Sequence, residues 1–365
     1  MIKRQTLTKT ILIATNHHTP AIELIKQLQN DPKYFWNIHY VGHIFPSETH
    51  ITNTIIPKLK IPFHNLDSGK LDRRYLPNTI KGIPKTIKAI FDSISLIQQI
   101  KPDIVVSFGG YLSVPIIIAA KFFKIPSITH EQTLTASLAT RINSYFVNKV
   151  ALSFNNKKQI SKFPFKKIII TGNLLRSEIF NLKNINYLQL EDKIKTRPLI
   201  YITGGNQGSS IINKTILKII KNLSSKYTII HNTGNIDIKY IKKQTKNILN
   251  YYPTTYVGLE DIGWVLNKSN LIISRSGANI SQEIVALNKK SILIPLPKSQ
   301  QNEQLLNALW VKKNLPEQTI ILNQDDLLEL TLKKAIDDLS LVKTKINQNQ
   351  TQINYNLLKL IHETV

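Results

Sequence analysis

Short apolar runs alternate with longer amphipathic stretches along the first half of the chain. Continuous apolar runs of this length are typical of buried strands in a parallel sheet, and helical spacing is found between several of them. The predicted strands are 11–15, 36–40, 104–108, 127–130, 149–154 and 167–171, and the predicted helices include 21–29, 86–99 and 114–123. This order predicts a parallel α/β domain.

A second set of alternating elements runs from 198 to about 341. Strand 198–203 precedes the amphipathic helix 211–223, and further apolar strands begin at about 272 and 292. The polar stretch 174–196 is predicted to be a linker, so the predicted domains are 1–173 and 197–345, with a last amphipathic helix in 346–365. The predicted fold class is therefore α/β, with two Rossmann-like domains facing each other across a cleft at the carboxyl ends of their strands.

A glycine-rich turn, Gly204–Gly208, connects a predicted strand to the helix that follows it. Backbone amides and the positive end of a helix suit a diphosphate at such a turn. The turn lacks the Gly-Lys-Ser/Thr ending of nucleotide-triphosphate loops and the G-x-G-x-x-G pattern of dinucleotide sites. Glycine is needed in any tight turn, so this signal is weak by itself.

The stretch from 272 to 308 predicts a nucleotide-sugar pocket. A helix is predicted to begin at about Ser281, with Glu283 in its first turn, where a carboxylate can accept hydrogen bonds from both hydroxyls of a ribose. Gln304 and Asn307 share one face of the next helix and offer amides to sugar hydroxyls. An ordinary loop and helix of a parallel-sheet domain is the alternative for this stretch alone.

The composition of the 365 residues, 42% hydrophobic and 19% charged, is that of a folded protein. Cysteine is absent, which excludes disulfides, thiolate metal sites and a cysteine nucleophile. No apolar run is long enough for a signal-peptide core or a membrane span, so we expect a cytoplasmic protein. The sequence has no D-x-D pair, and His39 and His43 lie too far apart on a strand to chelate together, so we expect neither a metal nor a cofactor.

Lysine and arginine outnumber acidic residues by 48 to 23, which gives a formal charge of +25 and indicates an anionic partner. Between 73 and 91, apolar residues at helical spacing stand beside basic ones, as an interfacial surface would require. These residues are Ile80, Ile83 and Ile87 with Arg73, Arg74, Lys81, Lys85 and Lys88. An amphipathic helix facing the core, or a composition bias without function, remains open.

Several motifs from about 11 to 314 resemble those of the MurG-type UDP-N-acetylglucosamine:undecaprenyl-diphospho-muramoylpentapeptide N-acetylglucosaminyltransferases. They are Asp103–Tyr111, His130–Gln132, Thr171–Asn173 with Arg176, Gly204–Gly208, Ser274–Gly277 with Glu283, and Gln304–Ala308. The resemblance implies a glycosyltransferase B fold and an inverting, metal-independent conversion of lipid I to lipid II in peptidoglycan synthesis. It further implies a peripheral protein at the cytoplasmic face of the cell membrane that binds UDP-N-acetylglucosamine and an undecaprenyl-linked acceptor. The lysines are scattered and form no recognisable binding module, so no nucleic acid is expected.

The resemblance also implies the roles of individual residues. His17, from the H-x-x-P loop, would be the catalytic base, with Glu131 behind it. The uracil would lie against the backbone near Leu259. The UDP-sugar would contact Arg176, Gly205, Asn206, Gln207, Gly208, Leu259, Arg275, Gly277, Ala278, Glu283, Gln304 and Asn307. The acceptor side would comprise Thr15, Asn16, His18, Gly109, Gly110, Tyr111, His130, Gln132 and Thr133.

Three positions depart from the family pattern. The glycine-rich first loop is shortened to Ala14–His18, Thr133 replaces an asparagine, and Asn206 replaces a serine. Two of these lie on the acceptor side, so a related transferase acting on another polyprenyl-linked or soluble acceptor is the alternative. Outside the transferases, a UDP-sugar 2-epimerase shares the two-domain fold, and a non-catalytic basic protein that binds nucleic acid would account for the charge.

Overall fold

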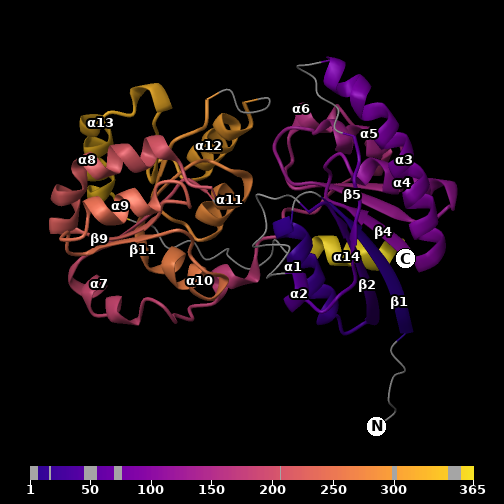
Figure 1. Ribbon diagram of the computed structural model, residues 1–365, viewed down its shortest axis with the longest axis horizontal. Coiled ribbons are helices and arrows are strands. Elements are labelled where there is room, and N and C mark those ends of the chain that lie inside the picture. Colours follow the sequence, from indigo (N-terminus) through magenta and orange to yellow (C-terminus); the bar gives the residue numbers. More distant parts are fainter. Residues whose placement is uncertain are drawn as a thin grey trace, which may run out of the picture. The chain divides into compact units, whose positions relative to one another are not determined.

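A computed structural model describes residues 7–15, 18–44, 56–69, 76–205, 207–297, 302–343 and 355–365. The chain forms two compact units (Figure 1). The first contains Met1–Arg176 together with Thr351–Val365, and the second contains Ser177–Gln350. In the part of the chain that the structure describes, no helix combines the length and the apolar character that crossing a membrane requires.

The first unit contains a seven-stranded parallel sheet in the order β3-β2-β1-β4-β5-β6-β7. Its strands are β1 (Leu7–Ala14), β2 (Tyr34–Gly42), β3 (Phe63–Asn65), β4 (Ile104–Ser107), β5 (Ser127–Glu131), β6 (Lys149–Leu152) and β7 (Ile168–Ile170). The strand order reverses between β1 and β4. The loops that leave these neighbouring strands at a reversal diverge to opposite faces, and parallel α/β sheets bind ligands there.

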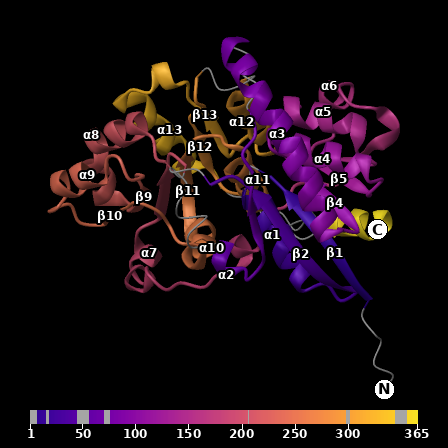
Figure 2. The ribbon, with the colours of Figure 1, turned by 45° about the vertical axis from the view of Figure 1, so that its right-hand side comes forward.

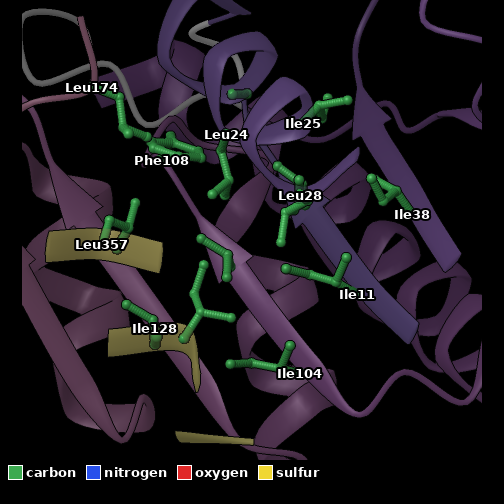
Figure 3. Close-up of a cluster of buried hydrophobic side chains, with 14 of the residues drawn as sticks. Ile11, Leu24, Ile25, Leu28, Ile38, Ile104, Phe108, Ile128, Leu174 and Leu357 are labelled. Atoms are coloured by element: carbon green, nitrogen blue, oxygen red, sulfur yellow. The ribbon is translucent and has the colours of Figure 1, made fainter. Parts of the chain in front are cut away.

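Helices cover both faces of this sheet because successive side chains of a strand point to opposite sides. Ile11 and Ile13 pack in one core with α1 (His18–Gln29) and α14 (Tyr355–Thr364), as Figure 3 shows in part. Leu12 and Ala14 belong to a second core on the other face. The helices there are α3 (Leu76–Ile100) and α4 (Ser113–Phe122), which lie side by side in Figure 2, with α5 (Leu138–Phe146) next to α4. The shorter helical segments of the unit are α2 (Ile56–Lys58), α6 (Lys157–Ile160) and η3 (Phe165–Lys167).

The second unit contains a six-stranded parallel sheet in the order β10-β9-β8-β11-β12-β13. The strands are β8 (Leu199–Thr203), β9 (Thr228–Asn232), β10 (Tyr251–Thr254), β11 (Ser269–Ser274), β12 (Ser291–Leu293) and β13 (Thr319–Ile321). The helices are α8 (Ser210–Lys226), α9 (Ile238–Gln244), α10 (Leu259–Lys268), α11 (Ala278–Ala286), α12 (Glu303–Asn314) and α13 (Glu329–Leu341). The strand order of this sheet reverses between β8 and β11.

The stretch expected to be a linker packs against α10. It contains η4 (Ser177–Phe180), η5 (Leu188–Leu190) and α7 (Lys193–Thr196). The Asp261 carboxylate accepts hydrogen bonds from the backbone amides of Ile185 and Asn186 at 2.6 and 3.1 Å. A Cβ at Gly263 would lie 2.0 Å from the carbonyl oxygen of Asn181, so only glycine allows this close approach. From Ser177 onward this stretch is therefore an integral part of the second unit.

The C-terminal helix α14 returns to the first unit. Leu357, Leu360 and Ile361 are buried in its core. The Nε2 atom of His362 lies 2.7 Å from a carboxylate oxygen of Asp31, and its ring stacks on Trp36. The sequence predicted this amphipathic helix without indicating which domain it covers.

Candidate active site

Two loops of the second unit leave its sheet as neighbours. Thr203 at the end of β8 pairs in register with Ser274 at the end of β11. The glycine-rich turn after β8 and the Arg275–Gly277 turn after β11 therefore start side by side, at the point where the strand order reverses. The structure thus brings together the turn predicted to suit a diphosphate and the first turn of the stretch predicted to form a nucleotide-sugar pocket.

The glycine-rich turn has backbone conformations that favour glycine. Gly205 and Gly208 have φ angles of 88° and 79°. A Cβ at Gly205 would meet no atom within 4 Å, whereas one at Gly208 would lie 1.9 Å from the carbonyl oxygen of Thr233. Gly205 and Gln207 are exposed, and α8 begins directly after the turn, so exposed backbone and a helix N-terminus coincide. This arrangement can bind an anion. Asn206 lies outside the described residues.

Arg275 connects three loops around this turn. Its guanidinium donates hydrogen bonds to the Ser209 hydroxyl (2.9 Å), the Gln324 side-chain oxygen (2.6 Å) and the carbonyl oxygen of Ile294 (3.1 Å). Burial lowers the pKa of Arg275. The side chain predicted to contact UDP-sugar therefore holds the glycine turn against the segment after β12. Ser209 and Gln324, its partners, were not identified from the sequence, because nothing in their local pattern distinguishes them.

The helix after β11 begins earlier than predicted. Gly277 is the N-cap and Ala278 the first residue of α11, so Glu283 lies in the second turn. The expected start at Ser281, with Glu283 in the first turn, is wrong. The helix starts as soon as the chain leaves the sheet, because Gly277 has an extended conformation that can cap it. The Glu283 carboxylate is buried. The helix dipole acts mainly within the first turn, so the N-terminus of α11 adds little to any interaction of this carboxylate.

Gln304 and Asn307 lie on α12 beside the β11 turn. The Asn307 amide donates to the carbonyl oxygen of Ser276 at 3.0 Å. The Ser276 hydroxyl donates to the carbonyl oxygen of Gln304 at 2.7 Å, and the Gln304 side-chain oxygen accepts from the amide of Leu296. Asn307 is buried and Gln304 is half-buried. Gln304 is therefore the better placed of the two to reach a sugar.

A third loop connects the edge strand β10 to α10. Gly258 is the N-cap of this helix and Leu259 its first residue. The backbone amides at this end are where a uracil carbonyl could accept hydrogen bonds. Beside the loop lies a pocket of about 440 Å³ whose lining includes Tyr252, Thr254, Tyr256 and Gly258.

In the first unit, the loop after β1 contains the histidine pair. Thr15 is buried, while Asn16 and His17 lie outside the described residues. His18 begins α1, and its Nδ1 atom lies 2.6 Å from the Tyr40 hydroxyl inside the fold. His18 is therefore oriented toward the core.

The loop after β5 is organised by Glu131. Its carboxylate accepts hydrogen bonds from the amide (3.2 Å) and hydroxyl (2.8 Å) of Thr133 and from the amide of Ser137 (2.9 Å). Its predicted place behind His17 stays a prediction, but these bonds show that it shapes its own loop. Thr133 retains a structural role at the position where the family pattern has asparagine.

His130 and Gln132 flank Glu131 and are buried. Burial lowers the pKa of His130, whose Nε2 atom donates to the carbonyl oxygen of Gly172 at 3.0 Å. His130 therefore supports the segment at Gly172 and has almost no surface that an acceptor could contact.

The loop after β4 contains Gly109 and Gly110, with φ angles of 74° and 80°. The Ser107 hydroxyl accepts from the Gly109 amide at 3.0 Å, and the half-buried Tyr111 follows.

Arg176 is the last residue of the first unit. Its contact with a nucleotide stays a prediction. Among the described ranges, no group of three or more His, Cys, Asp or Glu side chains could hold a metal ion.

Comparisons with known proteins identify the family. Residues 17–152 match the glycosyltransferase family 28 N-terminal domain, and 199–365 match the glycosyltransferase family 28 C-terminal domain. The UDP-N-acetylglucosamine--N-acetylmuramyl-(pentapeptide) pyrophosphoryl-undecaprenol N-acetylglucosamine transferase of Clostridium novyi (strain NT) is 32% identical, over 95% of this chain and 94% of its own. The enzyme of the same name from Clostridium botulinum (strain Langeland) is 32% identical, over 88% of this chain and 87% of its own.

Solved structures agree on the fold. The crystal structure of Acinetobacter baumannii MurG matches with a TM-score of 0.66 and 20% identity, covering 97% of this chain and 99% of that one. UDP-GlcNAc 2-epimerase from Neisseria meningitidis matches with a TM-score of 0.63 and 16% identity, covering 98% and 99%. Since transferases and epimerases share this fold, the sequence relatives and family models discriminate between them. The chain is a glycosyltransferase with two parallel Rossmann-like sheets of the glycosyltransferase B type, and it belongs to glycosyltransferase family 28.

Proposed function

We propose that this protein transfers N-acetylglucosamine from UDP-N-acetylglucosamine to a lipid-linked muramoyl-pentapeptide, converting lipid I to lipid II in peptidoglycan synthesis. The observation that carries the proposal is the juxtaposition of the Gly204–Gly208 turn and the Arg275–Gly277 turn at the ends of paired strands. It supports a donor site for a nucleoside-diphosphate sugar. The identity of 32% with relatives named for this reaction supports the choice of acceptor.

In the proposed reaction, a hydroxyl oxygen of the muramoyl group attacks the anomeric carbon of N-acetylglucosamine from the face opposite UDP. The new glycosidic bond forms as the bond from the anomeric carbon to the diphosphate oxygen breaks, which inverts the configuration. His17 accepts the hydroxyl proton. His18 is engaged with Tyr40, which leaves His17 as the candidate base of this pair. UDP departs with its negative charge stabilised by the glycine-turn amides and the N-terminus of α8.

The donor site would be built from four segments of the second unit. The glycine turn with Gly205, Gln207 and Gly208 would hold the diphosphate, Leu259 the base, and Glu283 the ribose. Gly277 and Ala278 at the start of α11 would line the nucleotide, and Gln304 would contact the sugar. Arg275 and Asn307 would support this site from behind, because their side chains already bind neighbouring loops.

We also propose that α3 docks the protein on the inner leaflet of the cell membrane, as a peripheral protein. Ile83, Ile87 and Phe91 are 47%, 51% and 65% exposed and lie four residues apart. They form one apolar stripe that the core does not cover, with the exposed Lys85 and Lys88 beside it. Phe122 on the neighbouring α4 is 70% exposed. Arg73, Arg74 and the side chains of Ile80 and Lys81 lie outside the described residues.

Incubation with labelled UDP-N-acetylglucosamine and a lipid I analogue, followed by product identification, tests the reaction. We expect free UDP and a disaccharide-linked lipid in equal amounts. UDP release with another polyprenyl-linked or soluble acceptor, but not with lipid I, would show that the proposed acceptor is wrong and that the transferase chemistry is right. Absence of UDP binding would reject the donor site itself.

A further inference from the structure

A continuous line of hydrogen bonds lies under the glycine turn, inside the second unit. The Tyr251 hydroxyl on β10 is 2.7 Å from Nδ1 of His231 on β9. Nε2 of His231 is 3.0 Å from the side-chain oxygen of Asn213 on α8. The Asn213 amide then donates to the carbonyl oxygen of Thr233 at 2.9 Å and to the Asp237 carboxylate at 2.8 Å.

The direction of every bond follows from Asn213. Its NH₂ group donates twice, so its oxygen must be the acceptor from His231. Nε2 of His231 therefore has the proton, and Nδ1 accepts from the Tyr251 hydroxyl. The imidazole is neutral, because complete burial lowers the pKa of His231 to about 3. All donors thus point from β10 toward Asp237, and reversing one link would leave a buried group without a partner.

One end of this line supports the glycine turn. A Cβ at Gly208 would lie 1.9 Å from the carbonyl oxygen of Thr233, and one at Gly234 would lie 2.1 Å from that of Gln207. The turn therefore rests directly on the segment after β9. The Asn213 amide holds that segment in place through the Thr233 carbonyl, while the Ser210 hydroxyl, in the first turn of α8, donates to Asp237.

The other end of the line reaches the start of β10, the strand that leads to the loop before α10. Tyr251 is the first residue of β10, the edge strand that leads to Gly258 and Leu259. An edge strand pairs on one side only, so the ladder to β9 and side-chain bonds such as that of Tyr251 determine its position. The line therefore links the segment under the diphosphate turn to the edge strand that leads, from its other end, to the base loop.

We propose that Tyr251, His231 and Asn213 are positioning residues that set the spacing between the base loop at Leu259 and the diphosphate turn Gly204–Gly208. This inference rests on the proposed donor site. His231 and Asn213 are buried inside the second unit and do not need to touch UDP, and Tyr251, which is 6% exposed, borders the pocket beside β10. Their effect is preorganisation of the donor site. When the two loops already have the spacing that a nucleoside diphosphate requires, its base and diphosphate bind without a free-energy cost for loop rearrangement.

The test is the gain in affinity from uridine through UMP to UDP, measured by calorimetry or competition. In Tyr251→Phe and His231→Leu, we expect uridine affinity within about twofold of wild type and a loss of about tenfold in the gain from uridine to UDP. His231→Gln keeps an amide donor for Asn213 and should lose less than His231→Leu. The control is Tyr227→Phe, which removes a hydroxyl bonded to Ser340 at the opposite end of α8 and should leave the series unchanged.

The outcomes separate the inference from the proposed function. If the wild-type protein does not bind UDP, the donor site is wrong. If it does, and Tyr251→Phe and His231→Leu keep the full gain from uridine to UDP, the positioning role is overturned. An equal loss for uridine and UDP would also overturn it, because that pattern indicates general destabilisation. Tyr251→Phe removes a single hydroxyl, so it provides the decisive result if His231→Leu does not fold.

Discussion

Glu283 is buried in the second turn of α11, with 1% of its surface exposed. We expect Glu283→Ala to weaken UDP binding by about 1.5–3 kcal/mol, because a carboxylate that accepts from two ribose hydroxyls makes charge-assisted bonds. Alanine favours a helix, so α11 itself should persist. Calorimetric titration with UDP measures the effect, and an unchanged affinity would remove Glu283 from the ribose site.

Two variants serve as controls for this change. Ser281→Ala removes, on the same helix, a buried hydroxyl with no hydrogen-bond partner among the described residues, and should leave UDP affinity at the wild-type value. Gln304→Ala should spare UDP and reduce discrimination between UDP-sugars, since a site built to bond a sugar group suffers when that bond is lost. An equal effect of Gln304→Ala and Glu283→Ala on bare UDP would contradict the sugar role of Gln304.

The two adjacent histidines should behave differently. His17→Ala should lower turnover by roughly 10²–10⁴-fold and leave UDP-sugar binding nearly intact, because a general base acts on the acceptor. His18→Ala should mainly lower thermal stability, since it breaks the buried contact with Tyr40. Steady-state kinetics with both variants decides the assignment. A larger turnover loss in His18→Ala would exchange the two roles, and wild-type turnover in His17→Ala would exclude His17.

At the scale of elements, α3 forms the proposed membrane-docking surface. Changing Lys81, Lys85 and Lys88 to glutamate should reduce sedimentation with anionic liposomes, because each basic residue near such a leaflet contributes about 1 kcal/mol. The loss should be greatest at low salt, where screening is weak. Lys85 is 3.2 Å from the Asp67 carboxylate, so its own share should be smaller than that of Lys88.

The matched control is the same charge reversal on α9, at the exposed Lys239, Lys242 and Lys243. It should leave liposome binding unchanged. Ile87→Ser with Phe91→Ser should weaken binding at both low and high salt, because apolar burial is not screened. Wild-type sedimentation of the α3 variants would show that the protein docks elsewhere, and turnover of a soluble short-chain acceptor should be unaffected in either case.

The apolar pattern of α3 was interpreted correctly as helical, but its extent was underestimated. The sequence predicted a helix from 86 and, separately, helical spacing between 73 and 91, whereas one helix begins at Leu76 and continues through Pro84. Proline removes one backbone hydrogen bond and usually ends a helix. Local residue preferences are weak compared with the packing of α3 against α4, which the sequence pattern does not contain.

At the scale of the molecule, α14 joins the end of the chain to the first unit through Asp31. Burial by itself raises the pKa of the Asp31 carboxyl, but hydrogen bonds from Trp36, Lys33 and His362 outweigh it and hold the pKa below its ordinary value. A carboxyl with a lowered pKa stabilises the fold above its unfolded-state pKa, and this stability is lost as the pH falls through the folded-state pKa.

Asp31→Asn should therefore lower the free energy of unfolding by roughly 1–3 kcal/mol at neutral pH, because the Trp36 and His362 donors lose a charged acceptor. The difference from wild type should shrink as the pH is lowered below about 4. Urea denaturation at neutral pH and below about pH 4 measures the free energy of unfolding of both proteins. His362→Gln keeps a donor for Asp31 and should cost less, and a pH-independent difference would contradict the electrostatic explanation.

The sequence by itself determined the fold class, and it predicted which loops form the donor site. Buried strands and amphipathic helices leave periodic apolar patterns, and a turn such as Gly204–Gly208 requires glycine at left-handed positions. Short strands such as β3 and β13 were missed, because three residues are too few to show a period. The start of α11 was placed too late for a similar reason, since Gly277 resembles any turn residue.

The tertiary structure alone decided which polar side chains are available for a ligand. Arg275, Glu131 and Asn307 have the donors and acceptors that a substrate site needs, yet Arg275 and Asn307 bind neighbouring loops and Glu131 binds its own loop. It also decided that α14 covers the first unit and that Tyr251, His231 and Asn213 form one line. Partners such as Asp31 and His362 are 331 residues apart, and no periodicity records a contact between elements that only folding brings together.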